Sequence, residues 1–275
     1  MSALTVWVEG AGLLGPGLPS WSSSLGTLRG EQPHVFVPAV LPPPARLPPA
    51  ERRRAGSAVK LAMAVADEAV AHAGADPRTL ATVFSASSGE GGNCHILCET
   101  LASDSPMVSP TRFTNSVHNA AAGYWHIAVA SRAASTSLGA FDASFGAGLI
   151  EAATSVALSG APILLVASDT PYPEPLQTAR PLPDNFGIAL VLSATRSERS
   201  LASLSIELVP GASVPTACED ASLEALRIAI PAACSLPLLQ ALARDEERLQ
   251  PLVLTYLPTL TLKVSLQRVN LHTLA

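Results

Sequence analysis

The chain has 275 residues, enough to bury a sizeable core in one large α/β domain or in two small ones. Hydrophobic residues make up 48% of it and charged residues only 14%, so we expect a substantial apolar face buried against another subunit. The net charge of −5 and the 4% of aromatic residues argue against a nucleic-acid-binding surface.

The least charged stretches run from Phe113 to Ser131 and from Ala152 to Ser168. Polar residues interrupt the first, and Gly160 and Pro162 interrupt the second, so neither has the ~20 apolar residues of a membrane span. The N-terminus shows no basic segment followed by an apolar block and a cleavage site. We therefore expect a cytoplasmic protein whose cysteines are reduced thiols.

The first third of the chain is predicted to hold one strand, one extended segment and one helix. Leu4 to Glu9 has the β-branched and aromatic residues of a strand. The proline-rich segment from Gln32 to Pro49 has no helical period, which predicts an extended path over the surface. A helix is expected from Ser57, as its cap, to about His72, with Gly74 ending it.

Strands and helices then alternate as far as residue 193, which is the pattern of a layered α/β sheet. The predicted strands are Leu80 to Ala86, Ser137 to Phe141, Pro162 to Ser168 and Ile188 to Ser193. The predicted helices are Asn93 to Leu101, Ser116 to Ala130 and Ala147 to Ser159. The continuous apolar character of residues 162–168 is typical of a strand covered on both faces.

The pattern changes after residue 196. A strand is predicted from Leu204 to Val209, followed by short helices at Ser222 to Ile228 and Leu236 to Arg244. Leu252 to Tyr256 and Leu260 to Val264 are predicted to pair as a terminal hairpin. We expect residues 1–275 to form a single domain, with residues 200–275 as a C-terminal α/β appendage.

Gly10, Gly12 and Gly15 follow the first predicted strand with the spacing of a dinucleotide-binding fingerprint. That site needs a helix that begins at the loop, with an acidic residue roughly twenty positions further on. Pro16 and Pro19 lie where the helix should begin. We interpret the glycines as a tight structural turn and expect no cofactor.

Two other clusters invite a functional interpretation. Cys94, His95 and Cys98 have a spacing that is poor for a structural zinc site, and no second Cys/His pair follows nearby, so we predict no metal site. The basic run from Arg52 to Arg54 is interpreted as ordinary surface charge, with contact to a carrier protein or a phosphate as the alternative.

Ser144 lies between a predicted strand and a predicted helix, as the serine of a nucleophile elbow does. The hydrolase elbow has glycine two residues before the serine, where this chain has Asp142. His118 and Asp169 could complete a triad, but nothing in the sequence shows that these groups converge. A serine-dependent acyltransferase or hydrolase that uses Ser144 therefore stays open as an alternative.

Residues 137–152 and the strand that follows them resemble the segment that carries the nucleophile in β-ketoacyl synthases. In that family a cysteine precedes a glycine by three residues, at the N-terminus of a buried helix. The helix dipole and the backbone N–H groups there favour the thiolate. Counting back from Gly146 places Ala143 at the position of this cysteine, so the resemblance implies that the nucleophile is lost.

Residues 108–125 resemble the loop and helix beside the acyl channel and dimer interface of the same family. Together with residues 169–176 they point to one group within that family. The chain is similar to the short chain-length factors of β-ketoacyl synthases from aryl polyene and related pigment pathways. This implies a thiolase-like α/β half, a mixed sheet covered by helices, without the second thiolase half. We therefore expect the catalytic histidine pair of that half to be absent as well, because the only histidine after His126 is His272.

The resemblance implies a non-catalytic subunit that forms a heterodimer with a complete β-ketoacyl-ACP synthase and shapes its acyl tunnel. An acyl carrier protein would deliver the acyl chain, with no cofactor, nucleic acid or membrane span involved. A degenerate structural homodimer stays open as an alternative. The candidate tunnel and interface residues are Leu97, Leu101, Met107, Phe113, Asn115, His118, Asn119 and Phe145.

These candidates have different expected roles. Leu97, Leu101, Met107 and Phe113 are expected to project toward the partner's channel, with ordinary core packing as the alternative. Phe145 is expected to plug the vestigial pocket beside the lost cysteine, and His118 to be a structural histidine with its hydrogen bonds satisfied. The small residues 120–123 are expected to allow a helix to approach closely across the dimer.

Overall fold

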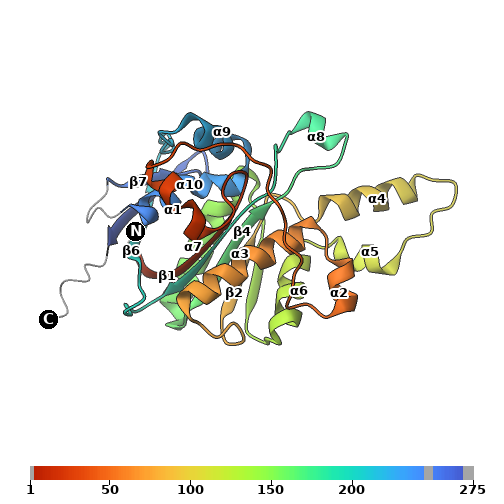
Figure 1. Cartoon of the computed structure of the whole chain (residues 1–275), viewed down its shortest axis with the longest axis horizontal. Helices are drawn as coiled ribbons and strands as arrows, with labels where there is room; N and C mark the ends of the chain where they lie inside the picture. Colours follow the sequence, from red (N-terminus) through yellow and green to blue (C-terminus); the bar gives the residue numbers. More distant parts are fainter. Residues whose placement is uncertain (1–2, 245–249, 269–275) are drawn as a thin grey trace.

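A mixed sheet forms the centre of the molecule (Figure 1). The structure, a computed structural model, describes residues 3–244 and 250–268. In these residues the sheet has eight strands, in the order β3-β2-β4-β5-β1-β6-β8-β7. Strand β2 runs parallel to β3 and to β4, and all other neighbours are antiparallel. The strands are β1 Leu4–Leu14, β2 Ala81–Ser85, β3 Ser135–Leu138, β4 Ile163–Asp169, β5 Phe186–Ser193, β6 Ala202–Pro210, β7 Leu252–Leu254 and β8 Leu260–Arg268.

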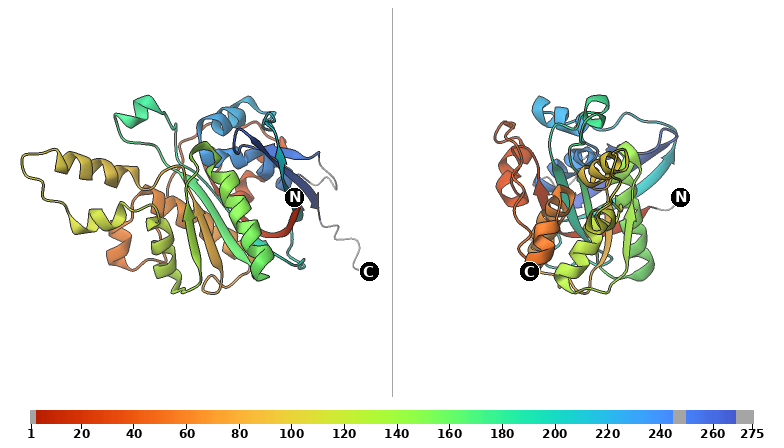
Figure 2. Two further views of the ribbon diagram at one scale, coloured as in Figure 1. Left: turned by 180° about the vertical axis from the view of Figure 1, so that it is seen from behind. Right: turned by 90° about the vertical axis from the view of Figure 1, so that its right-hand side faces the viewer.

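Helices cover both faces of this sheet (Figures 1 and 2). Helices α3 and α6 pack on one face, while α7, α1, α9 and α10 cover the other. The α-helices are α1 Trp21–Arg29, α2 Pro49–Arg54, α3 Ser57–Ala73, α4 Gly91–Leu101, α5 Pro110–Asn115, α6 Ala120–Val129, α7 Ser144–Ser159, α8 Leu176–Ala179, α9 Ala221–Ala229 and α10 Leu236–Ala243. Two 3₁₀ turns, η1 Phe141–Ala143 and η2 Pro231–Ser235, precede α7 and α10. The predicted mixed α/β sheet covered by helices is confirmed.

Strand β4 shows why its sequence is apolar throughout. All its residues are buried; Leu164 and Val166 belong to the core beneath α3, and Leu165 and Ala167 to the core beneath α7. A strand between two helical layers has no polar face, so the alternation expected of a half-exposed strand is absent. The prediction of a doubly covered strand is confirmed.

The C-terminal segment continues the sheet and covers one of its faces. Strand β6 pairs with β1 and with β8, and the predicted terminal hairpin is the β7–β8 pair. Helix α10 is buried along its whole length. The guanidinium of Arg29 donates to the Ala243 carbonyl at 2.8 Å, which satisfies an acceptor at the end of this buried helix.

The glycine pattern near the N-terminus does not form the predicted turn. Strand β1 continues to Leu14, so Gly10 and Gly12 lie within it, where helix α3 crosses. A Cβ at Gly10 would lie 2.4 Å from the Ala69 carbonyl oxygen, and one at Gly12 would lie 2.1 Å from that of Val65. The interpretation as a tight turn was wrong for these two glycines, which let the helix backbone approach the strand.

Local propensity missed four short helices and misjudged one helix start. Helices α1, α2, α5 and α8 lie in or beside segments rich in Gly, Pro and Ser. Ser57 is not the cap of α3; it is the first helical residue after Gly56, and no side chain caps the helix from that position. Instead, the Glu90 carboxylate, distant in sequence, accepts from the Ala58 N–H at 3.1 Å. The extended proline-rich path is confirmed for residues 33–44.

Strand β3 is displaced from its predicted position. It covers Ser135–Leu138 instead of Ser137 to Phe141, and α7 begins at Ser144 instead of Ala147. Phe141 therefore leaves the strand and enters the turn before α7. This displacement changes which residue lies at the apex of the turn.

Helices α4 and α5, with the loop between them, form a projecting arm, residues 91–115. Figures 1 and 2 show this arm extending well beyond the helices and strands of the core. No residue of α4 or α5 is buried. An arm with so little packing of its own is typical of a segment that another protein covers.

Candidate functional site

The candidate site is the turn that joins β3 to α7. The chain passes through the 3₁₀ turn at Phe141–Ala143 before α7 begins at Ser144. Phe141 has φ 52°, in the left-handed region that L-residues avoid at a cost of about 1–2 kcal/mol. Its side chain is 61% exposed, whereas Ala143 is only 6% exposed. The strained, exposed residue of this turn is therefore Phe141.

Arg180 holds the phenyl ring of Phe141 in place. Its guanidinium carbon lies 3.6 Å from the ring centroid, a cation–π contact. The same guanidinium forms an ion pair with Asp142 and donates to the Tyr172 hydroxyl at 3.3 Å. Arg180 directly follows α8, so the loop between β4 and β5 covers the turn.

Behind this cover lies a buried carboxylate, that of Asp169. It accepts hydrogen bonds from the Ser87 N–H at 2.7 Å, the Ser87 hydroxyl at 2.6 Å and the Ala232 N–H at 2.8 Å. Burial raises the pKa of Asp169 above its usual value, and the hydrogen bonds from Ser87 and Ala232 oppose this effect. The carboxylate joins the end of β4 to the loop before α4 and to η2.

Ser144 is 1% exposed, and its hydroxyl is occupied by the backbone of its own turn. It donates to the Phe141 carbonyl at 2.7 Å and accepts from the Ala140 N–H at 3.0 Å. His118 is exposed and lies 3.4 Å from the Ala86 carbonyl oxygen, while Asp169 binds Ser87 and Ala232. The hydrogen bonds of the described residues thus do not join Ser144, His118 and Asp169 into a triad, and this geometry gives no support to the serine alternative.

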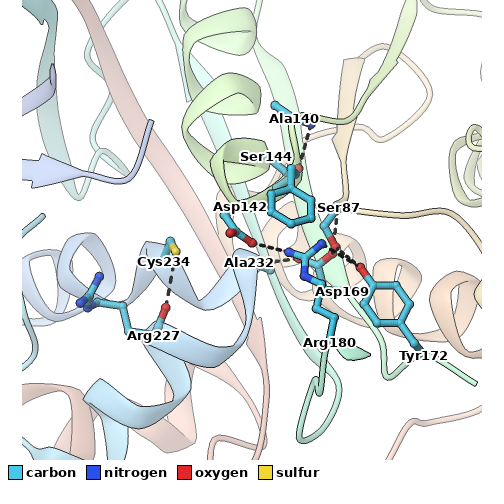
Figure 3. Close-up of polar contacts among 11 residues, drawn as sticks. Ser87, Ala140, Asp142, Ser144, Asp169, Tyr172, Arg180, Arg227, Ala232 and Cys234 are labelled. Carbon is cyan, nitrogen blue, oxygen red and sulfur yellow. Dashed lines mark hydrogen bonds and ion pairs between the residues drawn. The ribbon is translucent and has the colours of Figure 1, made fainter. Parts of the chain in front are cut away.

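Cys234 is a neighbour of the site that no sequence pattern indicated. It lies on η2, and Figure 3 shows it near Asp142 and Ala232 with its sulfur directed toward Arg227. The thiol donates to the Arg227 carbonyl at 3.5 Å, and burial raises its pKa. It is a protonated, buried thiol and not a thiolate nucleophile. Only the tertiary fold brings it close, so no local motif could have revealed it.

The four candidates for the tunnel all lie on the arm. Leu101, Met107 and Phe113 are 62%, 82% and 63% exposed, and Leu97 is half-buried. They belong to the surface of the arm and not to either core cluster. The exposed cysteines Cys94 and Cys98 lie on the same arm. Among the described residues, no group of three or more His, Cys, Asp or Glu side chains is placed to hold a metal ion.

The other candidates lie at the root of the arm or in the core. Asn115 accepts from the Tyr124 hydroxyl at 3.1 Å and donates to the Arg54 carbonyl at 3.3 Å, which ties α5 to α6 and α2. His118 and Asn119 are exposed just before α6. Phe145 is 1% exposed and is a member of the core beneath α7. The exposed aromatic ring at the turn is that of Phe141, which the sequence did not single out.

A small recess with an accessible volume of about 30 Å³, partly open to solvent, lies at the root of the arm. Its lining includes Phe84 from β2, Val59 from α3, and Glu90 and His118 from the loops beside the arm. Burial raises the pKa of Glu90, while the Ala58 N–H and Lys60 lower it. The recess combines apolar walls with a few polar groups, but it has room for only a few water molecules, so it is too small for a small-molecule site.

A sheet with helices on both faces, and a turn that leads into a buried helix of small residues, are the structural features to compare with known proteins. The family model "Beta-ketoacyl synthase, N-terminal domain" matches residues 28–250. The chain belongs to the β-ketoacyl synthase family. No curated protein sequence matches the chain. None of the helices in the described ranges has the length and apolar character needed to cross a bilayer.

Solved ketosynthase complexes share this fold. A chain of "Ketosynthase (ApeO) in Complex with its Chain Length Factor (ApeC)" from Xenorhabdus doucetiae has 21% identity and a TM-score of 0.71, with 96% of this chain and 100% of that chain covered. A chain of "The ishigamide ketosynthase/chain length factor" has 16% identity and a TM-score of 0.72, with 97% and 100% covered. At these identities the likeness shows the thiolase-like fold of a ketosynthase half.

Replacing Asp169 with asparagine should destabilise the β-ketoacyl synthase fold. Asparagine has one acceptor oxygen, so the Ser87 or the Ala232 N–H loses its acceptor, at a cost of about 1–3 kcal/mol. Chemical denaturation of the Asp169→Asn protein measures this. In the control, Asp142→Asn, the carboxylate is 58% exposed, and we expect a change below about 1 kcal/mol. Equal losses in the two variants would contradict the role given to Asp169.

Two substitutions of Phe141 separate its backbone strain from its ring contacts. Phe141→Gly and Phe141→Ala both remove the stack with Arg180, but only glycine adopts φ 52° freely. The glycine variant should therefore be the more stable by about 1–2 kcal/mol in denaturant titrations. At Leu158, 84% exposed within α7, the order should reverse, with glycine less stable than alanine by about 1 kcal/mol.

Proposed function

We propose that this chain is a non-catalytic subunit, a chain-length factor, that pairs with a complete β-ketoacyl-ACP synthase. The observation that supports this proposal is the composition of the turn before α7, whose exposed residue is Phe141 and whose residue three positions before Gly146 is Ala143. Neither side chain can form a covalent acyl intermediate. The structures of similar fold whose titles name a ketosynthase with its chain length factor support the same role.

An unpaired strand edge supplies a surface for the partner. Among the described strands, β3 pairs only with β2, so its other edge carries free backbone N–H and C=O groups. Such an edge is a template for a strand of another chain. Beside it, α6 exposes Ile127, and a Cβ at Gly123 would meet no atom within 4 Å. We assign this edge and this helix face to the interface with the ketosynthase subunit.

Of the small residues at the start of α6, Gly123 best fits the expected close approach. Ala120 and Ala122 are buried within this chain, at 9% and 4% exposure. Gly123 is exposed and lines a groove with Ser135 and Ser137 of β3. The helix therefore has one open glycine position toward the proposed partner.

The arm is the part of this subunit that reaches the acyl tunnel in our proposal. Leu101, Met107 and Phe113 are large apolar side chains held in water in the isolated chain. Their transfer into an apolar tunnel is favoured by about 25 cal/mol per Å² of buried surface. Bulky groups at the end of a tunnel limit the length of the chain that it holds, which is the expected function in an aryl polyene or related pathway.

An acyl carrier protein is the second partner in this proposal, because a tethered substrate must be brought to the complex. One solved structure of similar fold is described as an acyl-carrier protein in complex with its ketosynthase. It has 11% identity and a TM-score of 0.73, with 98% of this chain and 100% of that chain covered. We place the complex in the cytoplasm and treat residues 1–275 as one domain.

Substitution of the proposed interface should abolish pairing without disturbing the fold. Gly123→Arg introduces a charged side chain where the isolated chain has open space, so its melting temperature should stay unchanged. Co-expressed with the ketosynthase of the same gene cluster, this variant should elute apart from it in size-exclusion chromatography, because the charge would be buried unpaired.

The matched control is Ile228→Arg on α9, which is 72% exposed and belongs to a different part of the fold. It should co-elute with the ketosynthase as the parent chain does. Separate elution of the unmodified chain and the ketosynthase at micromolar concentration would overturn the heterodimer.

Shortening the apolar side chains of the arm should lengthen the product. Met107→Ala and Phe113→Ala remove volume from positions that are 82% and 63% exposed, so they leave the subunit folded and enlarge the proposed tunnel end. Mass spectrometry of the carrier-bound acyl chains should show longer polyenes than the parent complex forms. Leu158→Ala on α7 is the control and should leave the distribution unchanged.

An unaltered product distribution in Leu97→Ala, Leu101→Ala, Met107→Ala and Phe113→Ala alike would contradict the tunnel role. Pairing with the ketosynthase would then have a purely scaffolding function. The two results are separable because pairing is measured by elution and chain length by mass.

A further inference from the structure

The turn before α7 has the geometry of a nucleophile platform. In such a platform a strand leads through a sharp, strained turn into a helix, and the residue at the strained position presents its side chain at the top. In this chain β3 ends at Leu138, α7 begins at Ser144, and the left-handed residue between them is Phe141. Strain of this kind persists only where the surroundings fix the backbone.

We infer that position 141, and not position 143, is the reactive position of this turn, and that the Phe141 ring clamped by Arg180 blocks it. The inference refines the proposed non-catalytic role and rests on it. A nucleophilic side chain at position 141 would be exposed, whereas one at position 143 would be enclosed, since Phe141 is 61% exposed and Ala143 only 6%.

The neighbouring residues have structural roles in the turn. The Ala143 N–H donates to the Ala140 carbonyl at 2.9 Å, which closes the 3₁₀ turn. The Ser144 hydroxyl binds the backbone at Phe141 and Ala140. Asp142 is paired with Arg180. The Phe141 ring takes no part in these hydrogen bonds and contacts the Arg180 guanidinium instead.

The surroundings of position 141 would also favour a negative charge. The Arg180 guanidinium lies 3.6 Å from the Phe141 ring centroid, and α7 begins three residues further on with the positive end of its dipole. Three other titratable groups lie nearby. Asp142 forms an ion pair with Arg180 and takes up part of its charge, so the cation is shared between Asp142 and position 141. The Asp169 carboxylate accepts hydrogen bonds from Ser87 and Ala232, and Tyr172 forms hydrogen bonds with Arg180 and Ser87.

The test compares Phe141→Cys with Ala143→Cys in a chain whose exposed cysteines are removed by Cys94→Ser and Cys98→Ser. Cys218 and Cys234 are buried; burial raises the pKa of Cys218 to about 12 and also raises that of Cys234, so both stay unreactive. The probe is iodoacetamide, whose carbon forms a bond with the thiolate sulfur while its C–I bond breaks and iodide leaves. Peptide mass spectrometry gives the rate at each site.

At pH 7, the cysteine at position 141 should be alkylated at least about tenfold faster than the cysteine at position 143. Adding Arg180→Ala should slow the reaction at position 141 and move its pH profile upward, because the nearby cation is lost. The inference would be overturned if the cysteine at position 143 were alkylated as fast or faster. It would also be overturned if Arg180→Ala left the pH profile of alkylation at position 141 unchanged.

Two features keep this test decisive. It uses the isolated chain, so failure to pair with a ketosynthase leaves its result intact, and circular dichroism confirms that each variant is folded. If a cysteine variant does not fold, the comparison of Phe141→Gly with Phe141→Ala still applies. If the Phe141→Gly variant were no more stable to denaturant than the Phe141→Ala variant, position 141 would not be the strained residue of the turn, and the inference would be wrong.

Discussion

The buried carboxylate of Asp169 is the interaction on which the arrangement of this molecule depends. It ends β4, the strand between the two helical layers, and it binds Ser87 of the loop before the arm and Ala232 of the C-terminal cover. Three segments that are remote in sequence thus meet at one acidic side chain. An isolated buried charge is costly, and the donors from Ser87 and Ala232 offset that cost only when all three segments are in place. The arm, the turn and the C-terminal cover are therefore positioned together.

The elements that the sequence predicted well are those whose pattern is local. The doubly buried strand β4 and the long helix α3 carry their own hydrophobic period, and both were placed within a few residues. The contacts that define the site are not local. The cation–π contact of Arg180 with Phe141 and the hydrogen bond from Ala232 to Asp169 join segments that are far apart in the sequence. A local sequence pattern cannot reveal such contacts. Short helices in Gly- and Pro-rich segments, such as α1, were missed because their stability comes from packing and not from propensity.

The position of the lost nucleophile shows a second limit of prediction from the sequence. Counting back from Gly146 treats this glycine as a marker of the active site, but the structure gives it a packing role. A Cβ at Gly146 would lie 2.6 Å from the Thr255 carbonyl oxygen, and one at Gly148 would lie 2.6 Å from the Ser85 hydroxyl. Both glycines let α7 approach its neighbours, so their spacing from the turn need not be that of a catalytic site. The strain at Phe141 is visible only in the backbone, so the sequence pointed to Ala143 and did not single out Phe141.

The persistence of this strain has a physical explanation in the packing of α7. Gly148 lets the helix approach β2 and β4, Gly146 lets it approach Thr255, and Phe145 and Leu149 are buried in the core, so the start of the helix is fixed in space. The chain leaving β3 must reach that start within a few residues, which forces one residue into the left-handed region. Glycine would adopt that conformation at less cost, yet the chain has phenylalanine, whose ring is held by Arg180. The cation–π contact and the ion pair to Asp142 thus stabilise a turn whose geometry the fold imposes, and they do so by filling the position where a nucleophile would be exposed.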